Sequence, residues 1–226
     1  MLLDGRVPDV FMVSTMGMHS DRAMELIRDA RQIDPAVRPL IIAGGSHAVY
    51  EPFLLFADGE TKHVGPDVVV TGEEFVLLSL LEAILSVRAK NESIRSAFLR
   101  AKASGALDEI PGLIYPQGER AESDGIAEEL VDTGVQRLLG DLDELPHPVL
   151  GYQLLEAPSR RKRLAARALA PERVRWLSPI SSLVMTFGCK FACPYCPIPG
   201  YNQRQYRLKS GPRSAEEMGR LYKQYG

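Results

Sequence analysis

The sequence predicts an α/β protein built on a parallel β-sheet. Short, almost continuously apolar runs alternate with amphipathic stretches of helical period along residues 1–90. Strands of this kind are typical of parallel sheets that helices cover on both faces. Ligands of such sheets bind at the carboxyl ends of the strands, so the residues that follow each strand are the candidate binding residues.

The elements of this first part follow one another in strand–helix order. We expect a strand over 10–13, then a helix over 21–33 with Ser20 as its N-cap. A strand over 40–43 and a short helix over 51–57 come next. A strand over 67–70 precedes a helix over 73–88, whose inward face we expect to hold Val76, Leu77, Leu80, Leu81 and Ile84.

The middle of the chain has a different pattern. Residues 111–118 predict a small hairpin, 142–148 form a proline-punctuated connector, and 160–175 are a basic run that predicts a solvated, partly helical linker. A strand over 183–186 and a helix over 214–222 then resume the α/β order. Ser214 and Glu217 have the spacing of a capping box for this helix. The predicted parts are therefore 1–90, 91–175 and 176–226.

The composition is that of an ordinary globular protein, with 226 residues, 45% hydrophobic residues and a formal net charge of −2. This excludes a collagen-like chain, a wholly disordered chain and a disulfide scaffold. The charge balance gives no reason to expect a nucleic-acid or membrane partner. No apolar run reaches the ~18 residues that span a bilayer, and residues 1–6 do not have the order of a signal peptide. We therefore expect a cytoplasmic protein.

The three cysteines fall within eight residues, as Cys189, Cys193 and Cys196 with the spacing C-x3-C-x2-C. Thiolates are soft ligands that suit zinc or iron–sulfur clusters. A structural zinc site needs four ligands, and the nearest histidine, His147, lies 42 residues before Cys189. Three cysteines fit a cubane cluster with one iron left without a protein ligand. A zinc site and three metal-free thiols are the alternatives.

This loop resembles the signature of the radical SAM enzymes, C-x3-C-x-aromatic-C after the first strand of a β/α barrel, with Tyr195 as the aromatic residue. The resemblance implies that the three cysteines hold a 4Fe–4S cluster and that S-adenosylmethionine (SAM) binds the open iron. It also implies that the backbone of Tyr195 lies against the adenine. Reductive cleavage of SAM would give a 5′-deoxyadenosyl radical that abstracts hydrogen from a substrate, with a flavodoxin or ferredoxin as reductant.

The N-terminal region resembles the Rossmann-like, flavodoxin-like cobalamin-binding domain that precedes many radical SAM cores. Ser14-Thr15-Met16 corresponds to the family's Ser-x-Leu after one strand, and Gly44-Gly45 to its Gly-Gly after the next. The resemblance implies that Ser14, Met16, Gly44 and Gly45 shape a pocket for the nucleotide tail of cobalamin. It extends to the Pro-Gly-Leu-Ile-Tyr string at 111–115 and the Leu-Asp-Glu-Leu-Pro string at 142–146.

The family pattern is incomplete at both ends. A whole cobalamin domain has two further strand–helix units before residue 10, and a whole barrel continues beyond its first β/α unit. We therefore expect a fragment of a longer enzyme, inactive by itself: a partial cobalamin-binding domain, a linker and the first β/α unit of a radical SAM barrel. The expected parent is a cobalamin-associated radical SAM enzyme, with methyl transfer as the candidate reaction.

The cysteine pattern also raises two other functions. A methylthiotransferase would carry three more cluster cysteines in its N-terminal domain, and no cysteine lies outside 189–196. A non-catalytic cobalamin- or metal-binding module, with zinc at the three cysteines, is the alternative that stays open. Near the cysteines, Lys190, Asn202, Gln203, Arg204 and Arg207 are either solvated loop residues or contacts to SAM or substrate. The substrate itself is not predicted.

Overall fold

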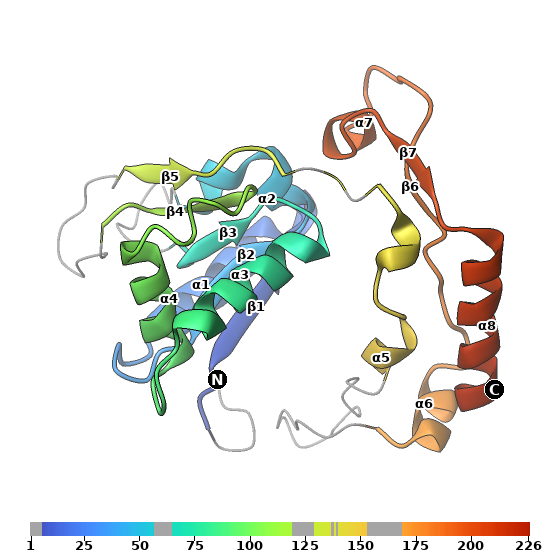
Figure 1. Ribbon diagram of the computed structural model, residues 1–226, viewed down its shortest axis with the longest axis horizontal. Coiled ribbons are helices and arrows are strands. Elements are labelled where there is room, and N and C mark those ends of the chain that lie inside the picture. Colours follow the sequence, from blue (N-terminus) through green and yellow to red (C-terminus); the bar gives the residue numbers. More distant parts are fainter. Residues whose placement is uncertain (1–5, 57–64, 119–128, 137, 139, 153–168) are drawn as a thin grey trace. The chain divides into compact units, whose positions relative to one another are not determined.

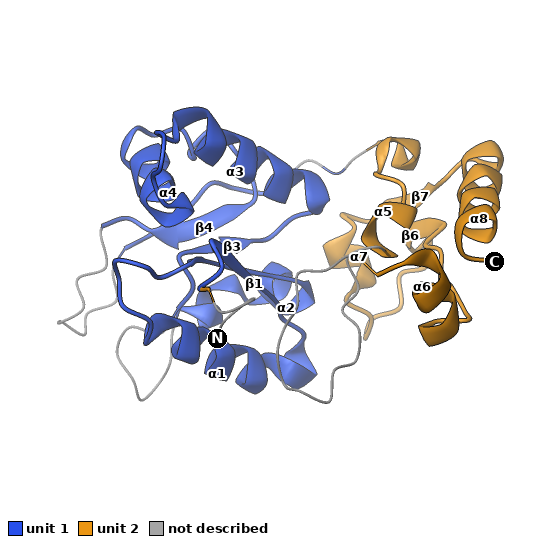
Figure 2. Ribbon diagram, turned by 90° about the horizontal axis from the view of Figure 1, so that it is seen from below, with its two compact units in different colours: residues 1, 7–138 blue, residues 2–6, 139–226 orange. Residues whose placement is uncertain are grey.

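The computed structural model describes residues 6–56, 65–118, 129–136, 138, 140–152 and 169–226 (Figure 1). The chain forms two compact units, one over Val7–Leu138 and one that holds Leu139–Gly226 (Figure 2). This division differs from the boundaries expected at 90 and 175. Residues 91–138 belong to the first unit, and the connector belongs to the second. Within the described residues, no helix is long and apolar enough to cross a membrane.

The first unit contains a five-stranded sheet in the order β1-β2-β3-β4-β5. The strands β1 (Val10–Ser14), β2 (Leu40–Gly44) and β3 (Val68–Val70) run parallel, as the sequence predicts. The strands β4 (Leu113–Pro116) and β5 (Leu130–Asp132) complete the sheet in antiparallel pairing. The result is a mixed α/β unit with a Rossmann-like, parallel part.

The hairpin expected over 111–118 is not formed. That segment supplies the single strand β4, whose two partners are β3 on one side and β5 on the other. The strand is buried along its whole length, because it lies inside the sheet and not in a separate linker. Both partners of β4 lie outside residues 111–118, so the pattern of this short segment does not reveal them.

Helices cover both faces of this sheet. Leu40 and Ile42 of β2 pack with α3 (Glu74–Val87) and α4 (Ile94–Ala103). Ile41 and Ala43, the alternate residues, pack with α1 (Ser20–Arg31) and α2 (Ser46–Tyr50). This alternation explains why the strands are apolar at every position. In place of the short helix expected over 51–57, the chain forms a 3-10 turn, η2 (Pro52–Leu55), and the helix α2 lies before that range.

The second unit is smaller and mainly helical. Its helices are η3 (Leu142–Glu144), α5 (Val149–Tyr152), α6 (Pro171–Leu177), α7 (Ile198–Tyr201) and α8 (Gly211–Tyr225). The strands β6 (Thr186–Gly188) and β7 (Tyr206–Leu208) pair antiparallel. The strand expected over 183–186 thus begins only at its last residue. The basic run at 160–175 lies mostly outside the described residues, and its last residues belong to α6.

Two predicted helix caps are wrong. Ser20 is the first residue of α1, and its Oγ donates a hydrogen bond to the carbonyl of Gly17 at 3.0 Å. The helix α8 is capped by Ser210, whose Oγ accepts from the backbone N–H of Arg213 at 3.1 Å. Pro212 fits the first turn of a helix. The observed N-cap therefore lies four residues before Ser214, the predicted one. Ser214 and Glu217 are consequently buried within the helix.

Candidate functional site

The first candidate site lies where β1 and β2 end. Ser14 and Gly44 are paired in the register of these parallel strands, so their carboxyl ends meet at one edge of the sheet. The backbone N–H and the hydroxyl of Thr15 both donate to the carbonyl of Gly44 at 2.7 Å. The N–H of His47 donates in turn to the carbonyl of Thr15 at 3.1 Å. The two loops that follow the strands are therefore fastened to each other.

Gly45 is required by this close approach. Its φ is +94°, a conformation that favours glycine. A Cβ at this position would lie 2.6 Å from the carbonyl oxygen of Thr15 and 2.8 Å from the hydroxyl of Ser14. The structure thus brings together three of the residues predicted for cobalamin, Ser14, Gly44 and Gly45, and leaves the hydroxyl of Ser14 beside a position without a side chain.

Several exposed apolar side chains lie on the segments that follow β1 and β2. Met16, the fourth predicted residue, is 52% exposed and precedes the short turn η1 (Gly17–His19). Other large apolar side chains on the segments after β1 and β2 are also exposed: Met18, Tyr50, Phe53 and Leu54. A contiguous patch of such side chains would be typical of a ligand-binding or interaction surface. The Nδ1 of His47 lies 3.7 Å from a carboxylate oxygen of Glu51, so the imidazole ring faces a side chain of the same segment.

A third segment completes the edge, and the sequence did not predict one of its residues. Gln136 is buried, and its Oε1 accepts from the backbone N–H of Glu73 at 2.6 Å. A Cβ on Gly72 would lie 2.0 Å from the same oxygen. Gln136 follows β5, which ends at the same edge of the sheet as β3. It was missed because its segment was assigned to the linker, and its contact spans 63 residues of sequence.

The second candidate site is the loop between β6 and β7. The three cysteines lie on this loop, which runs from Cys189 to Gln205. Cys189 directly follows β6 and is half-buried, Cys193 is exposed, and Cys196 is half-buried. A turn joins the last two, because the N–H of Cys196 donates to the carbonyl of Cys193 at 3.1 Å. All three thiols are free, and the side chain of Tyr195 is 87% exposed.

The loop offers three thiolates as candidate metal ligands. In the described part of the chain, no three His, Cys, Asp or Glu side chains are grouped as one metal ion requires. Zinc holds its sulfur ligands at about 2.3 Å, so the three thiolates would have to converge on one point. A cubane spreads its irons over separate corners and binds one thiolate at each. Three soft ligands on one accessible loop are suited to that arrangement.

The connector packs against the start of α8 beside this loop. A carboxylate oxygen of Asp143 accepts from the backbone N–H of Ser210 at 2.9 Å, and this bond to Ser210 lowers the pKa of Asp143. The Nδ1 of His147 accepts from the N–H of Val149 at 3.0 Å. Burial lowers the pKa of His147, and the charge of Arg220 lowers it further. These contacts anchor the segment after the cysteine loop.

A buried ion pair joins two elements of the same region. The ammonium of Lys209 donates to both carboxylate oxygens of Glu217 at 2.9 Å, and both side chains are almost fully buried. The guanidinium Nε of Arg213 lies 3.2 Å from the same carboxylate. Because Lys209 follows β7 and Glu217 lies on α8, the ion pair connects the paired strands β6 and β7 to this helix. Glu217 is therefore a structural residue and not the capping partner of Ser214.

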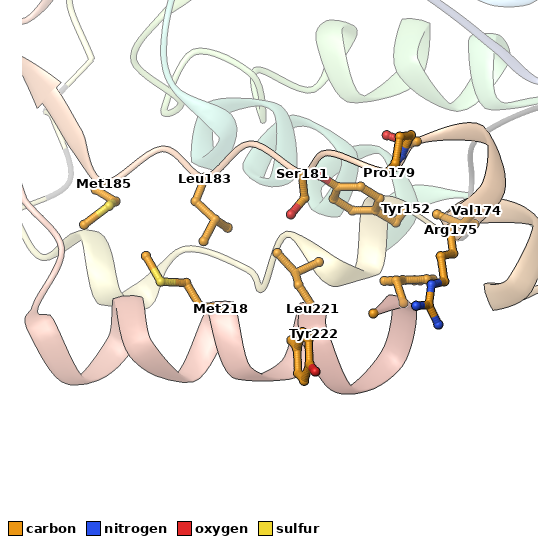
Figure 3. Close-up of a pocket in the computed structure, with 13 residues that line it drawn as sticks. Tyr152, Val174, Arg175, Pro179, Ser181, Leu183, Met185, Met218, Leu221 and Tyr222 are labelled. Atoms are coloured by element: carbon orange, nitrogen blue, oxygen red, sulfur yellow. The ribbon is translucent and has the colours of Figure 1, made fainter.

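A cavity of about 510 Å³ lies elsewhere in the second unit. It is lined mainly by apolar side chains of α8 and of the segment before β6, and Met185 and Met218 point toward one another across it (Figure 3). Arg175 contributes a cationic group at one end. None of the cysteines lines this cavity, so it is separate from the thiol chemistry of the loop.

The comparisons with known proteins give a structural likeness and no sequence family. No family profile matches the chain, and no curated protein matches it. The fold is similar to the solved structure of the radical S-adenosylmethionine methyltransferase TsrM from Kitasatospora setae, which holds cobalamin and a 4Fe–4S cluster. The TM-score is 0.56 at 19% identity, and the match covers 98% of this chain and 36% of that one. This chain thus spans about a third of that enzyme's length.

Proposed function

We propose that the chain is part of a cobalamin-associated radical SAM enzyme in which Cys189, Cys193 and Cys196 hold a 4Fe–4S cluster. The observation that carries the proposal is the C-x3-C-x2-C loop that begins directly after β6. Support comes from the fold likeness to TsrM, whose structure contains both a cluster and cobalamin. Methyl transfer is the reaction class proposed, because that enzyme is a methyltransferase.

The residues of the loop have distinct tasks in this proposal. The three thiolates bind three of the four irons and leave the fourth without a protein ligand, which is the position for SAM. When bound, the cluster supplies the electron that cleaves the sulfur–C5′ bond of SAM to methionine and a 5′-deoxyadenosyl radical. Tyr195 lies between two of these cysteines in the sequence and its side chain is exposed, and we propose that its backbone contacts the adenine.

The edge of the first sheet is the proposed cobalamin site. The hydroxyl of Ser14 offers a hydrogen-bonding group at the end of β1, and Gly45 lets a ligand approach the backbone closely. The exposed side chain of Met16 provides an apolar contact beside them. The proposed site lies at the carboxyl ends of the parallel strands, where α/β sheets generally bind their ligands.

The test is anaerobic reconstitution of the chain with iron and sulfide, followed by metal analysis and EPR of the dithionite-reduced sample. We expect close to four irons per chain and a cubane signal that changes when SAM is added. Cys193→Ala should lose this signal, whereas Ser182→Ala, an exposed serine of the same unit, should keep it. Uptake of zinc alone by a folded chain would contradict the proposed radical SAM function and favour a non-catalytic metal-binding module.

A further inference from the structure

The cysteine loop is closed at its base by a buried arginine. Arg207 lies on β7 directly opposite Phe187 on β6, and only 6% of it is exposed. Its guanidinium lies over the ring of Phe187, with 5.6 Å between its central carbon and the ring centroid. A stacked guanidinium of this kind joins the two strands through a cation–π contact. The sequence alone predicts for this residue either a solvated loop position or a contact to SAM or substrate.

The same guanidinium reaches the far arm of the loop. One of its terminal nitrogens donates to the side-chain oxygen of Asn202 at 3.2 Å. Asn202 is 3% exposed and follows α7, and its amide nitrogen donates to the carbonyl of Ile198 at 3.3 Å. Its own carbonyl accepts from the N–H of Gln205 at 2.7 Å. Arg207 therefore connects β6, β7 and the turn after the cysteines through one side chain.

The turn that Arg207 holds is strained. Gln203 and Arg204 both have positive φ, at +49° and +59°, although neither is a glycine. Gly188, immediately before Cys189, has φ +84°, and a Cβ there would lie 2.0 Å from the carbonyl oxygen of Gln205. Residues in sparsely populated conformations persist only where the surrounding structure over-determines them. Backbone hydrogen bonds constrain the turn itself, and the contact of Arg207 with Asn202 ties it to the base of the loop.

We propose that Arg207 is a positioning residue that holds the cysteine loop in shape before any cluster is bound. The proposal deepens the function proposed above, on which its cluster-binding consequence rests. A lysine does not replace this residue, because an ammonium has neither the planar fork that reaches Asn202 nor the flat face that stacks on Phe187. The planar shape of the guanidinium therefore holds the loop in place, and the positive charge of a lysine would not be sufficient to hold it.

The first measurement follows the loop without a cluster. Hydrogen exchange of the full chain, read by NMR, reports on the hydrogen-bonded N–H groups of Asn202, Arg204 and Gln205. We expect exchange about tenfold faster in Arg207→Lys and in Arg207→Met, the scale of one lost charged hydrogen bond. Arg220→Met removes an exposed arginine of the same unit and should leave these rates unchanged. Unchanged rates in both Arg207 variants would overturn the proposal.

A general loss of folding would give a different pattern. The N–H groups of the buried turns of α8, around Leu221, should keep their wild-type exchange rates if the role of Arg207 is local. Phe187→Leu removes the stacked ring and leaves the guanidinium, so it should accelerate the same loop amides without touching α8. If every variant accelerates α8 as much as the loop, Arg207 supports the unit as a whole and the proposed local role is wrong.

The second measurement is iron uptake during anaerobic reconstitution. We expect the two Arg207 variants to incorporate iron several-fold more slowly than the wild type and Arg220→Met, because their thiols must be ordered during assembly. Equal uptake rates in all four chains would contradict preorganisation. A wild-type chain that takes up no iron would contradict the proposed function instead, and the exchange rates would still decide the role of Arg207.

Discussion

At the scale of single residues, Gly45 is where the backbone leaves no room for a side chain. The substitution Gly45→Ala would place a methyl group within 2.8 Å of backbone atoms of Thr15, in a conformation that alanine rarely adopts. We expect the free energy of unfolding of the first unit to fall by about 2–3 kcal/mol. Urea denaturation followed by circular dichroism measures the change.

Gly17→Ala is the matched control for this substitution. Gly17 belongs to the turn after β1, and a Cβ there would meet no atom within 4 Å. Its effect should stay within about 0.5 kcal/mol. If both variants unfold at the same urea concentration, the close approach between Gly45 and Thr15 does not constrain the folded chain.

The pairing of Ser14 with Gly44 could be predicted from the sequence, whereas the role of Gln136 could not. Parallel strands that are adjacent in sequence bring their carboxyl ends together. The predicted ends of the first two strands were therefore enough to predict that Ser14 and Gly44 lie side by side. Gln136 reaches the same edge only because β4 and β5 add to the sheet in antiparallel order. Nothing in the residues around Gln136 indicates that pairing, which depends on distant parts of the chain.

His147 is expected to make the second unit sensitive to acid. Burial lowers its pKa in the folded chain below the ordinary value of 6.5, and the cationic Arg220 and Arg213 act in the same direction, against the carboxylates of Glu216 and Glu217. The unfolded chain therefore binds the proton first as the pH falls. The stabilisation is complete above pH 6.5 and is lost as the pH falls through the folded pKa, by at most about 1.4 kcal/mol per pH unit.

Urea unfolding between about pH 4.5 and pH 7.5 tests this dependence. His147→Asn keeps an acceptor for the N–H of Val149 and removes the titration, so its unfolding should vary less with pH over this range. Asp143 does not interfere, because its lowered pKa removes stability only as the pH falls below 3.8. A wild-type chain that gains stability as the pH falls from 7.5 would contradict the direction of the shift.

At the scale of whole elements, the start of α8 distinguishes the predicted cap from the observed one. Ser210→Ala removes the side chain that accepts from the N–H of Arg213, and we expect a loss of about 1 kcal/mol in the free energy of unfolding. Ser214→Ala should be neutral or stabilising, because its buried Oγ has no hydrogen-bond partner within the described structure. The opposite order in thermal or urea unfolding would restore Ser214 as the cap.

The elements that the sequence predicted well are those specified by local periodicity. The parallel strands β1, β2 and β3 and the helices α1 and α3 were predicted within a few residues, because apolar runs and helical periods are local signals. The capping box failed because serine and glutamate with this spacing also occur inside helices. In α8 the position of Pro212 and the buried pair of Glu217 with Lys209 decide the start of the helix.

At the scale of the whole molecule, the two candidate sites belong to different compact units, each with its own buried core. We therefore expect the two proposed cofactors to be lost independently. Met16→Glu places a carboxylate on the exposed apolar edge of the first sheet and should weaken cobalamin binding at least about tenfold, with the cluster intact. Cys193→Ala should abolish the cluster and leave cobalamin binding unchanged.

Equilibrium dialysis with cobalamin and EPR of the reconstituted chain measure the two losses in parallel. Val37→Glu is the control for Met16→Glu, because Val37 is 58% exposed and precedes β2, at the amino ends of the parallel strands. It should change neither measurement. If cobalamin binds wild type, Met16→Glu and Val37→Glu equally, the carboxyl edge of the sheet is not its site. If either of the two site substitutions removes both cofactors, the units do not bind them separately, and the assignment of one cofactor to each unit is wrong.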